Sequence, residues 1–169
     1  MRNRLPLLAL ALCLALESCL QPVRAASPID ARDWPMYNGN VLGWRHNPIE
    51  TALSSSVVAR LEEKWRFPPK GADFEIGAIH ATPAVVNGHV YFGTVNRAAF
   101  YKLTPDGKVK WSFPLNEKDD RVNKAEVGIV KGIYGSALVT EDAVYFGTLA
   151  GFVYALDRET GKEIGRAHV

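Results

Sequence analysis

Cysteine and long apolar runs are both scarce in this chain of 169 residues. Its two cysteines, Cys13 and Cys19, lie near the N-terminus, so the rest of the chain can form neither a disulfide nor a zinc–thiolate site. No apolar run reaches the roughly 20 residues of a membrane-spanning helix. The formal net charge is only +2, which argues against a strongly basic nucleic-acid surface. We therefore expect no transmembrane segment and no nucleic-acid partner.

The first residues have the pattern of a secretory signal. Arg2 and Arg4 precede an apolar run from Leu5 to Leu16, and Val23-Arg24-Ala25 offers a cleavage point. We therefore expect residues 1–25 to be a signal peptide and the mature protein to be periplasmic or extracellular. Cleavage would remove three arginines and one glutamate and would leave 17 charges of each sign.

A second interpretation of the same region gives Cys19 a role. Leu16-Glu17-Ser18-Cys19 loosely resembles a bacterial lipoprotein box, although a charged Glu17 is atypical of such a box. In this alternative Cys19 carries a lipid anchor and the protein is a membrane-anchored lipoprotein. Both interpretations predict export.

The strongest internal signal is a repeat. Val90-Tyr91-Phe92-Gly93-Thr94 recurs identically as Val144-Tyr145-Phe146-Gly147-Thr148, and flanking segments match at offsets of 53 or 54 residues. Lys64–Pro68 also echoes Lys110–Pro114, which indicates an earlier unit that contributes only its last strand. The repeating unit is about fifty residues long.

Each unit is predicted to be an antiparallel meander of short strands. Asn87-Gly88 is a two-residue hairpin signal, because both central positions of such a turn favour positive φ, and Glu141-Asp142 holds the same place in the second unit. Thr104–Gly107 and Asp157–Gly161 form the next turns, with glycine in the left-handed position. The repeated Val-Tyr-Phe-Gly-Thr strand does not alternate with polar residues, so we expect it to be covered on both faces.

Small and large residues indicate how the units pack. Gly93 and Gly147 lie inside strands, where they predict the close approach of another backbone. Trp65 and Trp111 lie near the last strand of a unit and are expected to be buried between sheets.

These observations predict an all-β fold, a β-propeller of radially stacked four-stranded antiparallel sheets, with a β-sandwich as the alternative. We divide the chain into the signal peptide, an N-terminal lead-in segment (residues 26–52) and a partial propeller (residues 53–169) of about two to three blades. Closed propellers typically have 4 to 8 blades. Missing blades or a protein partner are therefore expected to cover the open faces.

Two segments resemble a known family. Tyr154–Lys162 closely resembles the repeat motif of pyrroloquinoline-quinone (PQQ) propellers, and Tyr101–Lys108 with Trp111 is a looser second copy. Asp33–Pro48 looks like the first segment of quinoprotein dehydrogenases. The superfamily that the chain resembles contains quinone-dependent alcohol or sugar dehydrogenases as well as non-catalytic scaffold propellers. PQQ and calcium are cofactors that this resemblance implies, and only this resemblance implies them.

In the dehydrogenases, the quinone accepts a hydride, calcium polarises its carbonyl and a carboxylate acts as the base. Those enzymes tend to carry Gln-Glu shortly before a Thr-Pro, whereas this chain has Ile79-His80-Ala81-Thr82-Pro83. His80 therefore replaces the carboxylate. We expect an exported scaffold or binding module, with no identifiable catalytic, cofactor-binding or metal-binding residue. The alternative is the N-terminal part of a PQQ- and calcium-dependent alcohol or sugar dehydrogenase, so enzymatic activity stays open.

Other side chains have both a functional and a structural interpretation. His80 could line an axial pocket, but a strand-end histidine bonded to the backbone is favoured. The four tryptophans could stack on a flat cofactor, but Trp65 and Trp111 occupy repeat positions that favour blade packing. Arg45 is a candidate to pair with a carboxylate that closes the lead-in segment against a blade. Structural or exposed roles are expected for His46, for His89 and for Glu117–Arg121, the last being a loop between blades and not a calcium site.

Overall fold

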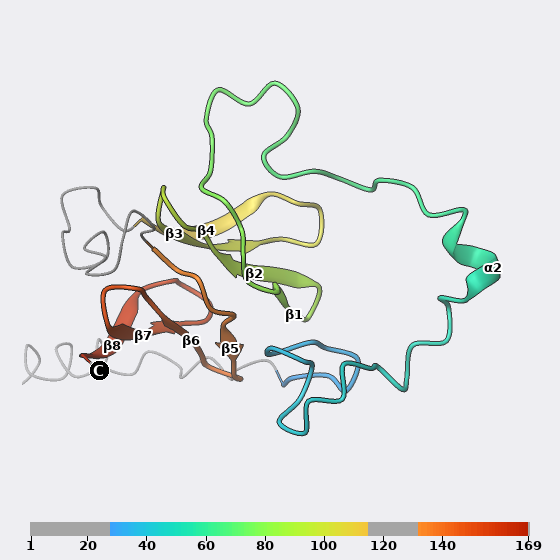
Figure 1. The fold of residues 1–169 in the computed structure, drawn as a ribbon, viewed down its shortest axis with the longest axis horizontal. Coiled ribbons are helices and arrows are strands. Elements are labelled where there is room, and N and C mark those ends of the chain that lie inside the picture. The colour runs from blue at the N-terminus through green and yellow to red at the C-terminus, as the bar shows by residue number, and fades with distance from the viewer. Residues whose placement is uncertain (1–27, 115–131, 169) are drawn as a thin grey trace, which may run out of the picture.

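The computed structural model describes residues 28–114 and 132–168, which contain two four-stranded antiparallel sheets (Figure 1). The first sheet has the order β1 (Ala84–Val86), β2 (His89–Gly93), β3 (Ala99–Leu103) and β4 (Val109–Pro114). The second has the order β5 (Leu138–Val139), β6 (Ala143–Gly147), β7 (Phe152–Asp157) and β8 (Glu163–His168). One helical turn, α2 (Ser55–Val58), lies in the long segment before the first sheet. The predicted four-stranded antiparallel units are confirmed.

The two sheets repeat the same strand register. Tyr91 pairs with Ala84 in the first sheet, and Tyr145 pairs with Leu138 at the equivalent place in the second. Both sheets also contain an irregularity at the same point of the third strand, between Lys102 and Leu103 and between Ala155 and Leu156. The sequence repeat is therefore a structural repeat.

The turn between β1 and β2 has the predicted geometry. Asn87 and Gly88 have φ values of 51° and 72°, as a two-residue hairpin with two left-handed positions requires. Neither Glu141 nor Asp142 has a positive φ. At that turn Thr140 bonds both ways with Ala143, since its amide donates to the carbonyl of Ala143 (2.8 Å) and its hydroxyl accepts from the amide of Ala143 (3.1 Å).

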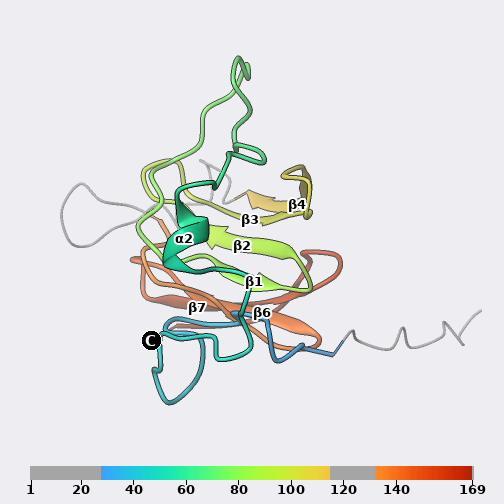
Figure 2. The ribbon, with the colours of Figure 1, turned by 90° about the vertical axis from the view of Figure 1, so that its right-hand side faces the viewer.

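The sheets stack face to face, as Figure 2 shows. The rings of Phe100 in β3 and Phe146 in β6 are parallel within 9°, with centroids 4.5 Å apart, at the centre of a continuous apolar core. Stacked rings of this kind stabilise a packed core beyond the area that they bury. No helix in the described ranges is long and apolar enough to cross a membrane.

Trp111 is buried between the two sheets as predicted, whereas Trp65 is only partly buried against the first sheet. The indole Nε1 of Trp111 donates to the carbonyl of Arg158 in the second sheet, and that of Trp65 donates to the carbonyl of Pro105 in the first, both at 3.1 Å. Trp65 lies in an extended segment outside the named strands. This segment therefore contacts the first sheet in the same way as β4 contacts the second.

The predicted backbone approach at the strand glycines is wrong. A Cβ at Gly93 would lie 2.2 Å from Cγ2 of Ile133, so a side chain rather than a backbone fills that space. A Cβ at Gly147 would meet no described atom within 4 Å. The difference arises because Ile133, which precedes β5, inserts against the first sheet.

The lead-in segment pairs with both sheets. Trp34 and Val85 of β1 exchange two backbone hydrogen bonds (2.7 and 2.8 Å), and the amide of Val139 in β5 donates to the carbonyl of Pro35 (2.8 Å). The segment thus lies along the edge that β1 and β5 share.

Candidate functional site

The edge formed by β1 and β5 is where the two sheets come closest to each other. Blades of a propeller converge toward its central channel, so this edge is the axial side of the pair. Residues 79–83 and 132–137 lead into these two strands. They are therefore placed on the side where a propeller binds its axial ligand.

A cavity of about 360 Å³ lies where those two segments meet the lead-in segment. The imidazole of His80 stacks on the ring of Tyr134, with centroids 4.6 Å apart and planes 20° apart. The amide of Thr82 donates to the hydroxyl of Ser136 at 3.1 Å. The full lining comprises Tyr37, His80, Ala81, Thr82, Tyr134, Gly135 and Ser136.

The two contacts in this cavity join repeat-equivalent residues. His80 and Tyr134 are 54 positions apart, as are Thr82 and Ser136, which is the offset of the repeated strand. Tyr134 and Ser136 were missed by sequence reasoning, although this offset applied to His80 and Thr82 would have found them. The favoured interpretation of His80 is wrong, because no hydrogen bond joins it to the backbone in the described part of the chain. It lines the axial cavity instead.

Among the described residues Arg45 pairs with no carboxylate, contrary to the expectation from the sequence. Its Nε donates to Oδ1 of Asn38 at 2.8 Å, and its Nη2 lies 3.4 Å from the hydroxyl of Tyr37. Its guanidinium carbon also lies 5.9 Å from the centre of the Tyr37 ring, within the range of a cation–π contact. Arg45 therefore steadies the loop that brings Tyr37 to the axial cavity.

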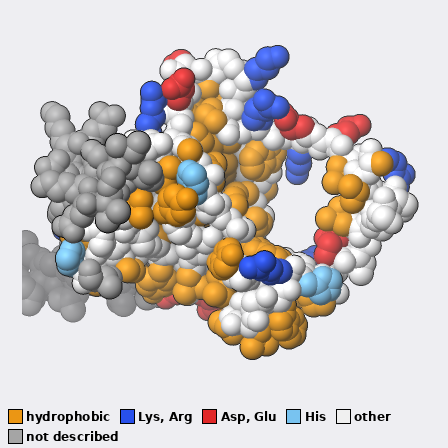
Figure 3. All heavy atoms as spheres, in the orientation of Figure 1, with side chains coloured by type: hydrophobic (Ala, Val, Ile, Leu, Met, Phe, Trp, Pro, Cys, Tyr) orange, Lys and Arg blue, Asp and Glu red, His pale blue; other side chains and the backbone are white. Residues whose placement is uncertain are grey.

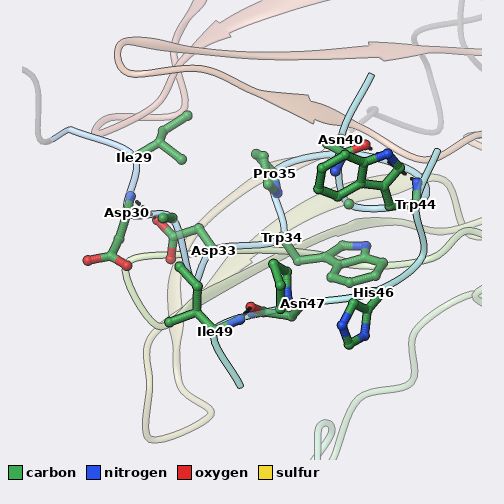
Figure 4. Close-up of a pocket in the computed structure, with 13 residues that line it drawn as sticks. Ile29, Asp30, Asp33, Trp34, Pro35, Asn40, Trp44, His46, Asn47 and Ile49 are labelled. Atoms are coloured by element: carbon green, nitrogen blue, oxygen red, sulfur yellow. Dashed lines mark hydrogen bonds between the residues drawn. The ribbon is translucent and has the colours of Figure 1, made fainter. Parts of the chain in front are cut away.

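Trp34 and Trp44 do not pack between blades. They line a second cavity, of about 310 Å³, that the lead-in segment forms with itself (Figure 4). The rings of Trp34, Trp44 and His46 gather on one side of it. The loop beside it exposes apolar side chains to solvent (Figure 3), with Val41 the most exposed.

The axial cavity fits part of a quinone cofactor. Its aromatic rings offer a flat apolar surface, and the hydroxyls of Tyr37, Thr82 and Ser136 can bond to carbonyl or carboxylate oxygens. Its lining contains no carboxylate. The described residues also contain no group of three His, Cys, Asp or Glu side chains that could hold a metal ion. These residues can therefore form a wall of a quinone site, but not its calcium site or its base.

Two predicted residues or segments remain, and the structure describes only one of them. His89 is half-buried, with Nδ1 3.2 Å from the carbonyl of Asn87, and burial lowers its pKa. This agrees with the structural role expected from the sequence. Glu117–Arg121 lies outside the described residues.

Comparison with known proteins decides the family. The PQQ family described as "Glucose/ethanol/alcohol dehydrogenase, beta-propeller domain" matches residues 34–166. The chain belongs to the PQQ β-propeller family. The predicted resemblance and the propeller architecture are thus confirmed.

Several quinone alcohol dehydrogenases are similar to the chain over most of its length. The dehydrogenase subunit of an alcohol dehydrogenase (quinone) from Gluconobacter oxydans is 31% identical over 133 residues, which are 77% of this chain and 16% of the relative. A 1-butanol dehydrogenase (quinone) from Thauera butanivorans is 28% identical over 72% of this chain and 18% of the relative. The chain thus spans less than a fifth of the curated relatives it matches.

Solved structures show the same fold. A quinohemoprotein alcohol dehydrogenase from Pseudomonas putida HK5 covers 82% of this chain with a TM-score of 0.66 and 24% identity, while the chain covers 19% of that structure. The corresponding enzyme from Comamonas testosteroni covers 81% of the chain, with a TM-score of 0.61 and 21% identity, and the chain covers 19% of it. The two sheets therefore correspond to part of a propeller, and the partial propeller indicates missing blades.

Proposed function

We propose that this chain forms blades at the start of an exported propeller of the quinone-dependent alcohol dehydrogenase type. In this proposal the axial cavity is one wall of the cofactor site. The observation that carries it is the pair of contacts, His80 on Tyr134 and Thr82 to Ser136, that two repeats bring together on the axial side. The relatives named as quinone alcohol dehydrogenases support the same assignment.

The described residues would bind and orient rather than react. A bound PQQ would supply hydride acceptance. Tyr37, His80 and Tyr134 would contact its flat ring, and the hydroxyls of Thr82 and Ser136 would bond to its oxygens. The calcium ligands and the base carboxylate would come from other blades, because this cavity contains no acidic side chain.

A binding or scaffold module without turnover is the second candidate. It is favoured by the imidazole of His80, which stands where the dehydrogenases tend to carry a carboxylate and stacks on Tyr134. This module would use the same axial wall to hold a ligand or a partner without oxidising it.

One titration separates the two candidates. The protein with its full set of blades, which would include the calcium ligands and the base, is titrated with PQQ in the presence and absence of calcium and followed by absorbance and by dye-linked alcohol oxidation. We expect saturable binding that His80→Ala and Tyr134→Ala each weaken about tenfold, which corresponds to the loss of one good contact. Tyr145→Ala is the matched control, because Tyr145 lies in β6 and does not line the axial cavity. Binding with turnover supports the dehydrogenase, binding without turnover supports the module, and no binding rejects both cofactor assignments.

Export is a separate part of the proposal. It is supported by the basic residues, apolar run and cleavage point of residues 1–25. Mass spectrometry of the protein expressed with its own N-terminus is expected to show a mature chain that begins at Ala26. A chain that begins at a lipidated Cys19 supports the anchored alternative, and an uncleaved chain in the cytoplasm rejects export.

A further inference from the structure

A charged amino group is buried between the two sheets. The side chain of Lys102 in β3 is 1% exposed, and its Nζ donates to the carbonyl of Arg158 at 2.8 Å. The same Nζ lies 3.3 Å from Oε1 of Glu159 and 5.4 Å from the centre of the Tyr91 ring. The contacts with Arg158 and Glu159 cross from the first sheet to the turn between β7 and β8, whereas the contact with Tyr91 lies within the first sheet.

Lys102 is an exception within the repeat. Its equivalent in the second sheet is Ala155, because Lys102 pairs with Tyr91 as Ala155 pairs with Tyr145. The other contacts at this junction are not exceptional. The bond from an indole to a turn carbonyl occurs at the preceding junction too.

The shared contacts cannot distinguish one blade from another. Sheets of the same design present the same apolar face, and repeat proteins are prone to pair such faces wrongly or to exchange them between copies. A buried ammonium ion does distinguish them, because it loses its hydration and needs both a hydrogen-bond acceptor and a negative charge at one place.

The second sheet provides both groups at the required place. The turn after β7 offers the carbonyl of Arg158, which also accepts the bond from Trp111, and the adjacent carboxylate of Glu159. The same Oε1 of Glu159 lies 3.7 Å from Nε of Arg158, so this carboxylate serves two buried cations. Burial lowers the pKa of Lys102, and Glu159 opposes that shift.

The first sheet provides a different turn. Its carbonyl at Pro105 accepts the bond from Trp65, and its one carboxylate, Asp106, is bonded to Lys108 at 2.8 Å and to Thr104. A second copy of the first sheet would therefore offer Lys102 only an aspartate, which is one methylene shorter than Glu159 and is already bonded to Lys108 and Thr104.

We propose that Lys102 makes this face selective for the second sheet of its own chain and disfavours pairing with other blades, including the first sheet of a second copy. The apolar contacts supply the attraction, and the buried lysine decides which sheet is accepted. Selection by a buried polar group that adds little stability is known from coiled coils, where it fixes the pairing register.

The test compares Lys102→Met with Lys110→Met, which removes a lysine from an exposed position on β4. Two differently tagged copies are unfolded together, refolded and separated by size, and the fraction of mixed dimers is measured by tag capture. We expect Lys102→Met to keep the melting temperature within a few degrees of the wild type and to raise the mixed-dimer fraction several-fold. Lys110→Met is expected to change neither.

Glu159→Gln gives an independent readout. It leaves the ammonium group without its carboxylate, so it is expected to lower the melting temperature. The addition of Lys102→Met is expected to restore part of the loss, because Arg158 also loses this carboxylate. An unchanged mixed-dimer fraction in Lys102→Met overturns the proposal. So does a methionine variant that fails to fold, because the lysine would then provide stability rather than selection.

Discussion

Trp111 of the first sheet lies against the backbone of Gly161 in the second. A Cβ at Gly161 would come within 2.6 Å of the indole carbon Cδ2 of Trp111. Gly107 has the same relationship to Trp65, again at 2.6 Å. The contact is therefore a repeated feature of the junction between units, and it leaves no room for any side chain on the turn glycine.

Gly161→Ala tests this contact. We expect a loss of about 2–4 kcal/mol in the free energy of unfolding, because alanine is strained at φ +70° and its methyl group overlaps the indole. Gly71→Ala is the control, since Gly71 also has a positive φ but has no neighbour within 4 Å. Denaturant unfolding of both variants measures the difference, and equal losses would show that the indole contact contributes nothing.

The two strand glycines provide a matched pair. Gly93→Ala is expected to cost about 1–3 kcal/mol, because its methyl group would displace Ile133 from the core. Gly147→Ala meets open space and is expected to change stability by less than about 0.5 kcal/mol. Thermal unfolding of the two variants gives the comparison, and a larger loss at Gly147 would contradict the placement of Ile133.

The first hairpin turn predicts a difference between equivalent positions. Asn87→Ala is expected to cost about 1–2 kcal/mol, since alanine is disfavoured at the left-handed φ of 51°. Glu141→Ala, at the equivalent turn without positive φ, should be nearly neutral. Asn87→Gly keeps the conformation and should recover most of the loss, as unfolding midpoints of the three variants can show.

Acid stability should depend on Asp157. The hydroxyl of Thr160 donates to its carboxylate at 2.7 Å, and this bond, with two backbone amides, lowers the pKa of Asp157. A lowered folded-state pKa stabilises the fold above the unfolded-state value, about 3.9, and this stabilisation is lost as the pH falls through the folded-state value. Asp157→Asn should therefore be less stable than the wild type at neutral pH. The gap should narrow in unfolding curves as the pH falls below the unfolded-state value, and a gap that does not vary with pH would contradict the assignment.

The strands and turns could be predicted because their signals are local. Asn87-Gly88 requires a particular backbone conformation whatever surrounds it, and the repeated Val-Tyr-Phe-Gly-Thr segment marks the same strand twice. The stacking of His80 on Tyr134 was also within reach, since one repeat offset relates them. The insertion of Ile133 was not, because it depends on the path of an irregular segment, and the repeat offset that relates Ile133 to Ile79 does not say which sheet its side chain contacts.

The pairing of the lead-in segment was equally hidden from the sequence. The backbones of Trp34 and Pro35 form hydrogen bonds with strands that lie far along the chain. Such backbone hydrogen bonds do not depend on the type of side chain, so the sequence does not indicate them. A carboxylate partner was predicted for Arg45 because a cationic side chain is commonly paired with an anionic one. The structure instead uses its planar, multi-donor group to hold an amide and a phenol ring.

The double attachment of Trp34 and Pro35 also has a consequence for synthesis. This stretch leaves the ribosome before either of its partners, yet it cannot complete its hydrogen bonds until β5 has been made. Contacts so distant along the chain form late and slow folding. This early stretch of the chain is thus among the last to settle, and it closes the pair of blades only once both exist.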